Sequence, residues 1–131
     1  MPLSKNGKFT RSRSRWQYPY KNEHPTDKLK IKMLLNEKIK GNRIAGLEAR
    51  IEAGQVHKMH THRNEFVIVY CLDGKCLVTV GSTTRTVHPK TLIFIPPGVP
   101  HRFYNKFSEP WKGIAFAIGT NAKIKNDWLE E

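Results

Sequence analysis

Three histidines and a glutamate fall within the short segment VHKMHTHRNEF, residues 56–66. His60 and His62 are two positions apart, a spacing that places both imidazoles on one face of a β-strand. Two neighbouring imidazoles can share one metal ion, and imidazole suits iron, zinc, copper and nickel. By the same alternation, His57 is expected to point to the opposite face. The segment therefore predicts a metal site with His60 and His62 as two of its ligands.

A third ligand has to come from a distant part of the chain, and two late histidines are available. His101 follows the turn PPGVP, whose prolines and glycine fix the direction in which the next strand begins. His88 stands before a proline at the end of a different strand and is expected at the surface. We therefore predict His101 as the third ligand.

The elements that must position these side chains are predicted to be β-strands. Apolar and polar residues alternate in KLKIKMLLN (28–36) and GLEARIEAG (46–54), and FVIVYCL (66–72) is a continuous apolar run. Turn residues recur about every eight to twelve positions without helical periodicity between them, which is typical of an all-β sandwich or barrel. Asp73-Gly74 predicts a tight hairpin. The tail is expected to hold a short helical turn.

Two separated motifs make the sequence resemble the cupins, which are small all-β, double-stranded β-helix (jelly-roll) barrels. The first motif, Gly-x5-His-x-His ending in a later glycine, is matched by Gly54, His60, His62 and Gly74. The second, Pro-x-Gly-x2-His-x3-Asn, is matched by Pro96, Gly98, His101 and Asn105. The resemblance covers about residues 44–118 and implies a barrel metal held by the three motif histidines. Asn105 is expected to fix a loop by hydrogen bonds.

The sequence departs from the family pattern at one position. In the family, three or four residues usually separate the second histidine from a glutamate, and at those positions this chain has Phe66 and Val67. Glu65 is the only carboxylate nearby, one strand step of roughly 6–7 Å from Val67 on the same face. The sequence leaves open whether Glu65 is a fourth metal ligand or a catalytic acid–base group beside the ion. Tyr104 is the second candidate for moving a proton.

Four residues are predicted to line a substrate pocket beside the metal. Lys58 has the same parity as the histidines of the first motif, and Phe103 has the same parity as the histidine of the second. Val67 and Val69 continue the inward face as an apolar floor, which suits a small, partly apolar ligand. Lys58 could bind an anion at the pocket mouth or be a solvated residue at a strand end.

The net charge of +12 is concentrated at the front of the chain. Residues 1–45 carry twelve Lys/Arg against three Asp/Glu, whereas residues 46–131 carry eleven against eight. Clustered basic residues are typical of segments that contact nucleic acid. An Arg- and Ser-rich start is also typical of an organelle transit peptide. The simplest interpretation is a solvated basic arm, and the sequence leaves the three open.

We divide the chain into a basic extended arm (1–27), a β-barrel (28–120) and a tail (121–131). Trp16, Tyr18 and Tyr20 alternate with other residues, as in a strand whose aromatic face packs on its own domain or on a second subunit. Two cysteines argue against a disulfide scaffold and favour free thiols in a reducing cytoplasm. No apolar run reaches the roughly 18 residues of a membrane span.

Together these features favour a small metal-dependent enzyme that acts on a small organic molecule. The resemblance implies either a non-haem iron dioxygenase or a lyase or isomerase. Fe(II) is the preferred ion, with Zn, Ni or Mn as alternatives. A homodimer is implied as well. The competing hypothesis is a non-catalytic module that binds a small ligand or a metal, with nucleic-acid contact through the arm. The lack of a helix-turn-helix pattern argues against a complete regulator.

Overall fold

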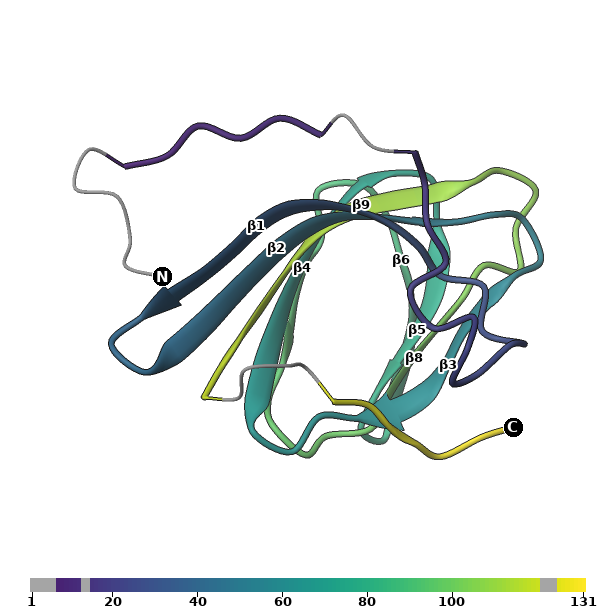
Figure 1. The fold of residues 1–131 in the computed structure, drawn as a ribbon. Coiled ribbons are helices and arrows are strands. Elements are labelled where there is room, and N and C mark those ends of the chain that lie inside the picture. The colour runs from purple at the N-terminus through teal and green to yellow at the C-terminus, as the bar shows by residue number, and fades with distance from the viewer. Residues whose placement is uncertain (1–6, 13–14, 121–124) are drawn as a thin grey trace.

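The computed structural model describes residues 7–12, 15–120 and 125–131, so the predicted arm and tail lie partly outside the described residues. Two antiparallel five-stranded sheets form the walls of a barrel (Figure 1). The first contains, in order, β1 (Lys30–Ile39), β2 (Asn42–Ile51), β9 (Trp111–Gly119), β4 (Glu65–Asp73) and β7 (Leu92–Ile95). The second contains β10 (Asp127–Trp128), β3 (Val56–Thr61), β8 (His101–Tyr104), β5 (Cys76–Val80) and β6 (Thr83–Val87). None of the described residues forms a helix long and apolar enough to cross a membrane.

The apolar core lies between the two sheets, as the alternating patterns predict. Ala49 and Ile51 of β2 are buried against Trp111 at the start of β9, and Ile95 of β7 is buried on the same side. Because successive side chains of a strand face opposite ways, each strand gives the barrel interior every second residue. The predicted all-β fold is confirmed.

The turn after β4 differs from the hairpin predicted at Asp73-Gly74. Strand β4 pairs with β7 and β9, whereas β5 pairs with β6 and β8, so the turn carries the chain from one sheet to the other. Gly74 has a φ of 74°, and a Cβ there would meet the carbonyl oxygen of Pro110. Cys71 and Cys76 are buried free thiols. Burial raises the pKa of both, that of Cys76 to about 12.

The described parts of the two chain ends pack beside the barrel. Gln17 forms an isolated bridge with β1, and the rings of Trp16 and Tyr18 lie next to β1 lysines. Lys32 is 4.7 Å from the ring of Trp16, and Lys30 is 5.5 Å from that of Tyr18. At the other end, the expected helical turn is wrong for residues 127–128, which form β10 against β3. A strand partner outweighs weak helical propensity in so short a segment.

Asn105 ties the loop between β8 and β9 to the end of β2. Its side chain is fully buried and donates to the carbonyl oxygens of Ile51 (3.0 Å) and Glu109 (2.7 Å). Its amide oxygen accepts from the backbone N–H of Phe107 at 3.0 Å. All hydrogen-bonding positions but one of this amide are therefore used for positioning the loops around β8, the strand that begins with a predicted ligand.

We predict that Asn105→Ala lowers the free energy of unfolding by about 2–4 kcal/mol, because it leaves two carbonyls and one N–H without their partner. Urea unfolding followed by circular dichroism measures this loss. The matched variant Asn42→Ala, at the exposed first residue of β2, should change stability by less than about 0.5 kcal/mol. Equal effects of the two variants would contradict the role given to Asn105.

Candidate metal centre

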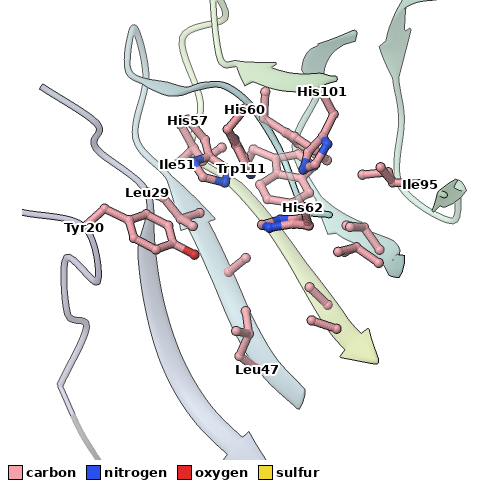
Figure 2. A pocket seen from close by; sticks show the side chains of 16 residues that line it. Tyr20, Leu29, Leu47, Ile51, His57, His60, His62, Ile95, His101 and Trp111 are labelled. Atoms are coloured by element: carbon pink, nitrogen blue, oxygen red, sulfur yellow. The ribbon is translucent and has the colours of Figure 1, made fainter. Parts of the chain in front are cut away.

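Three histidines meet inside the barrel at one end of the second sheet (Figure 2). His60 lies on β3 and pairs directly with His101, the first residue of β8, while His62 follows β3 immediately. One ring nitrogen of each lies within 4.8 Å of the others, and all three side chains are buried. The structure thus brings together the three residues that the sequence assigned to a metal.

Each of these rings has its Nδ1 atom tied to a backbone oxygen. The acceptors are the carbonyl oxygens of Lys58 for His60 (2.6 Å), Lys125 for His62 (3.2 Å) and Val99 for His101 (3.0 Å). A carbonyl can only accept, so Nδ1 must carry the proton and Nε2 keeps its lone pair. Metal-binding histidines are held in this way, with the second nitrogen donating to an oxygen.

The electrostatics of the cluster favour neutral rings. Burial lowers the pKa of all three, that of His101 to about 3, against the smaller opposing effect of its bond to Val99. Neutral imidazole is the form that binds a metal. The three Nε2 atoms carry no proton that a metal would have to displace. They therefore suit a divalent ion of the kind that imidazole binds.

Glu65 is not part of this cluster. Its side chain is buried at the start of β4, on the inward face shared with Val67. It lines a separate cavity with Lys125 and Asp127 and accepts a hydrogen bond from the backbone N–H of Asn64 at 3.2 Å, and its charge acts on His62. Among the described residues, only the three histidines group as a candidate metal site. The structure therefore gives no support to Glu65 as the fourth ligand.

The alternation of β8 turns Tyr104 away from the site. His101 and Phe103 are buried, whereas Arg102 and Tyr104 alternate with them and contact each other, with the guanidinium 5.1 Å from the ring centre. Tyr104 does not line the cavity below the histidines. The alternation of β8 places its phenol on the outer side of the sheet, and a catalytic role for Tyr104 stays a prediction.

A cavity of about 90 Å³ opens below the three histidines. Val67, Val69 and Phe103 line it, where the sequence placed them, and Trp111 closes one side (Figure 2). Lys58 is not among the lining residues, and neither is any other lysine or arginine of the described chain. Lys58 therefore lies outside this cavity, and an anion-binding role for it stays a prediction.

A β-bulge explains the errors at Lys58 and His57. His57 pairs with Phe103 and His60 with His101, so three steps on β3 match two on β8. The extra residue reverses the alternation, so His57 points into the cavity and lies 4.4 Å from His60 between ring centres. Counting residues with a period of two does not detect a bulge, because the extra residue shifts the alternation by one position.

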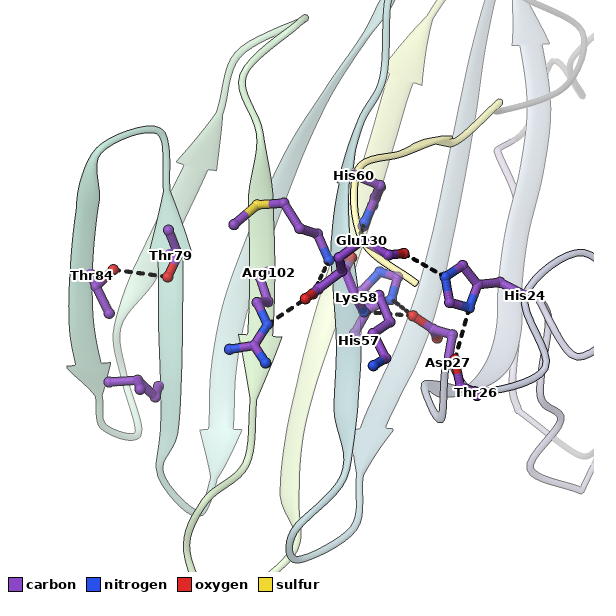
Figure 3. A network of polar contacts seen from close by, with 12 residues as sticks. His24, Thr26, Asp27, His57, Lys58, His60, Thr79, Thr84, Arg102 and Glu130 are labelled. Atoms are coloured by element: carbon purple, nitrogen blue, oxygen red, sulfur yellow. Dashed lines mark hydrogen bonds and ion pairs between the residues drawn. The ribbon is translucent and has the colours of Figure 1, made fainter.

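Asp27 is the residue that sequence reasoning missed (Figure 3). Its carboxylate is completely buried and accepts from Nδ1 of His57 at 2.9 Å and from the backbone N–H of Lys58 at 2.6 Å. Its other oxygen accepts from the N–H of Leu29 at 3.1 Å. Burial alone would raise the pKa of Asp27, but the bonds and the charge of His57 outweigh it and the pKa is lowered. The sequence feature that could have pointed to Asp27 was the presence of an acidic residue in an otherwise basic segment.

Two further residues from the chain ends reach the site. Tyr20 lines the cavity and stacks on His57, with ring centres 5.6 Å apart and planes 6° from parallel. Trp128 of β10 packs against His60 at 5.1 Å. Glu130 holds the tail in place by accepting from Arg102 at 2.8 Å (Figure 3). The site is thus built partly by segments on either side of the two motifs.

The sequence matches a known domain family. The family model described as "Cupin domain" matches residues 47–116. An uncharacterized protein from Methanocaldococcus jannaschii is 32% identical over 83 residues, which cover 63% of this chain and 66% of that protein. The match therefore spans slightly less than two thirds of that relative.

Solved structures show the same architecture. KdgF from Halomonas sp. has a TM-score of 0.67 at 16% identity, covering 82% of this chain and 90% of that one. A Klebsiella pneumoniae protein with a double-stranded β-helix domain has 0.65 at 15%, covering 76% and 84%. A predicted oxalate decarboxylase from Thermotoga maritima has 0.64 at 19%, covering 70% and 80%. At these identities the likeness shows the fold, and the predicted double-stranded β-helix is confirmed.

We predict that the metal-free protein loses stability as the pH falls from about 6.5 towards about 3. Above the ordinary histidine pKa of 6.5 both states are neutral at His101 and stability is fully present. Below pH 6.5 the unfolded chain binds a proton at this histidine that the folded chain does not bind until about pH 3. Each unit of difference between the two pKa values lowers the free energy of unfolding by up to about 1.4 kcal/mol. Urea unfolding across this range measures the slope. His101→Gln should flatten it, and an unchanged slope in that variant would contradict the assignment.

Proposed function

Since this chain belongs to the cupin family, and since three neutral imidazoles converge in its barrel, we propose that it is a divalent-metal-dependent enzyme that acts on a small organic molecule. His60, His62 and His101 are the proposed ligands. The observation that carries the proposal is the set of three buried Nδ1–H groups, each bonded to a carbonyl, which leaves three Nε2 atoms facing one another. A purely structural histidine cluster would have no need for three free lone pairs at close range.

The chain's own residues define what the site can do. Three protein ligands leave coordination positions free for a substrate on the cavity side. A bound ion would supply Lewis acidity or, if redox-active, electron transfer. The apolar side chains around the cavity exclude water, and a volume of about 90 Å³ restricts the substrate to a small molecule.

We propose Fe(II) as the working ion, with Zn, Ni or Mn as competitors. Imidazole binds all of these ions, so three histidine ligands alone discriminate little between them. An oxygen-dependent dioxygenase needs two adjacent free positions, which a three-histidine site has. A lyase or isomerase uses the same positions without oxygen. Oxygen consumption by the Fe(II)-loaded protein during turnover separates these two classes.

The competing hypothesis, a non-catalytic module with nucleic-acid contact, has less support. Trp16 and Tyr18, two of the aromatic residues of the basic segment, lie against lysines of β1 in the same chain. Those rings are therefore occupied by contacts within the domain. The similarity to a structure described as a predicted oxalate decarboxylase also favours an enzyme.

We predict that the purified protein holds about one divalent ion per chain, and that His62→Ala or His101→Ala loses it. Mutating a residue that only hydrogen-bonds to a metal ligand already lowers metal affinity about 10- to 100-fold. The loss of a ligand itself should therefore lower metal affinity at least about 100-fold. Elemental analysis after anaerobic reconstitution with each candidate ion measures both. His88→Ala, on an exposed turn, is the matched control and should bind normally. A wild-type protein that binds none of the ions would refute the proposal.

We further propose that the chain forms a homodimer through the outer face of the first sheet. Large apolar side chains are exposed there on neighbouring strands, namely Tyr70, Leu92, Phe94 and Phe116. Phe94 and Phe116 flank Ile68 in the strand register, so the patch is continuous. Continuous exposed apolar patches mark protein interfaces.

Phe94→Glu is expected to convert the dimer to a monomer, because a charge at the centre of an apolar interface is not compensated. Light scattering after size-exclusion chromatography measures the mass. Phe9→Glu, at an exposed position of the N-terminal segment, is the comparison variant. If Phe9→Glu breaks the dimer and Phe94→Glu does not, the copies are joined by the N-terminal segment and the sheet face is excluded.

A further inference from the structure

We propose that the phenol of Tyr20, oriented by Asn126, donates a hydrogen bond to the ligand in the barrel cavity. The ligand class that follows is a small, largely apolar molecule with an uncharged acceptor oxygen, such as an ether, a ketone or an ester. The inference rests on the proposed function only in taking the ligand of this cavity to be the substrate. It names a contact point for that ligand away from the three histidines.

The phenol of Tyr20 stands on the wall of the cavity. Tyr20 is one of the lining residues, and Figure 2 shows its oxygen pointing into the cavity. Its ring stacks on His57 with ring centres 5.6 Å apart, and it packs edge-to-face with Trp128 at 5.3 Å. Because two aromatic neighbours hold the ring, the direction of its oxygen is fixed.

Tyr20 is set apart from the candidate metal ligands by the ring of His57. The ring centres of Tyr20 and His57 are 5.6 Å apart, and those of His57 and His60 are 4.4 Å apart. Among the described residues, Tyr20 makes ring contacts with His57 and Trp128 and with none of the three proposed ligands. A ligand that reached from the ion to the phenol would therefore extend across part of the cavity.

Asn126 lies beside the phenol. It is only 7% exposed, and its two amide atoms are buried without reaching full hydrogen-bond geometry with any described residue. The amide is nevertheless close enough to the phenol to lower the pKa of Tyr20, against the larger effect of burial. An N–H directed at the phenol oxygen lowers the pKa in this way. The proton of the phenol itself is then left for another acceptor.

The phenol keeps its proton and therefore acts as a donor. Burial raises the pKa of Tyr20, and the negative charges of Asp27 and Glu23 raise it further, so that the pKa lies above its ordinary value despite the contact with Asn126. An ordinary phenol is already protonated at neutral pH. The group that meets the O–H of Tyr20 in the cavity must therefore be an acceptor.

The rest of the lining sets the character of the ligand. Apart from the histidines and Tyr20, the residues that line the cavity of about 90 Å³ are hydrophobic. Moving a charged group into such a lining costs more than moving an ether or carbonyl oxygen, whose lost bond to water the phenol replaces. A site that hydrogen-bonds one group of its ligand also rejects the analogue that lacks this group. The cavity thus suits a small apolar body with one uncharged acceptor oxygen.

Tyr20 and Asn126 lie on either side of residues 47–116, the region that matches the cupin family model. Tyr20 comes before β1, and Asn126 directly precedes β10. The polar contact proposed for the ligand is therefore built by the two end segments of this chain. Membership of the family does not by itself imply it.

Tetrahydrofuran and cyclopentane test this directly, because the two rings have nearly the same shape and only the first carries an acceptor oxygen. NMR titration of the full chain, both metal-free and zinc-loaded, gives the two affinities from the shifts of methyl groups that line the cavity. Tyr20→Phe keeps the ring stacked on His57 and removes the oxygen. Its affinity for tetrahydrofuran relative to cyclopentane should fall about fivefold. In the wild type, bound tetrahydrofuran should show nuclear Overhauser contacts with the ring protons of Tyr20.

Two further variants separate recognition from packing. Tyr18→Phe removes the same oxygen from a tyrosine that is 40% exposed, and it should leave the ratio of the two affinities intact. Asn126→Ala should lower this ratio in the wild type but not in Tyr20→Phe, because Asn126 acts through the phenol. An equal effect of Asn126→Ala in both backgrounds would contradict its positioning role.

The remaining outcomes decide the inference. An unchanged ratio in Tyr20→Phe, an equal loss of affinity for both probes, or a wild type that binds neither probe overturns it. Because the ratio is also measured on the metal-free chain, a failure to bind zinc would count against the proposed function alone.

Discussion

The candidate site depends on the hydrogen bonds that satisfy its buried imidazole rings. A buried ring whose N–H lacks a partner would cost about 1–3 kcal/mol, and four such rings would endanger a barrel of this size. Here each Nδ1–H finds an oxygen, three on the backbone and one on Asp27. For His60 and His101 the acceptor lies two residues earlier in the same segment. The local backbone therefore orients the rings of His60 and His101, and the barrel fold brings their two strands, β3 and β8, side by side.

The other two acceptors tie the chain ends to the site. Asp27 comes from the segment before β1, and Lys125, whose carbonyl holds His62, comes from the segment before β10. Trp128 then covers His60 from the tail side. The two motifs alone would leave His57 and His62 without these partners. A chain reduced to the region matched by the cupin model would thus keep the ligands but lose what orients two of the rings.

Period-two alternation was sufficient to predict most strands, the all-β fold and the shared face of His60 and His62, because it follows from backbone geometry alone. The choice of His101 came from the turn before it and from the second cupin motif. It failed where geometry is not periodic. The bulge on β3 reverses the faces of His57 and Lys58, and a bulge leaves no trace in a polar–apolar pattern. The glycine at position 74 indicated a turn correctly, but whether a turn joins neighbours or crosses between sheets depends on distant strands.

The displaced glutamate changes the electrostatics of the site more than its shape. A carboxylate bound to the ion would cancel part of its charge and occupy a coordination position. In this chain Glu65 lines a different cavity, from which its charge still acts on His62, and Asp27 places a second negative charge beside His57. A charge placed one imidazole further out still lowers the cost of burying an ion, but more weakly, because Coulomb energy falls with distance. Because no carboxylate of the described residues joins the three histidines, the proposed ion keeps a free coordination position for a ligand.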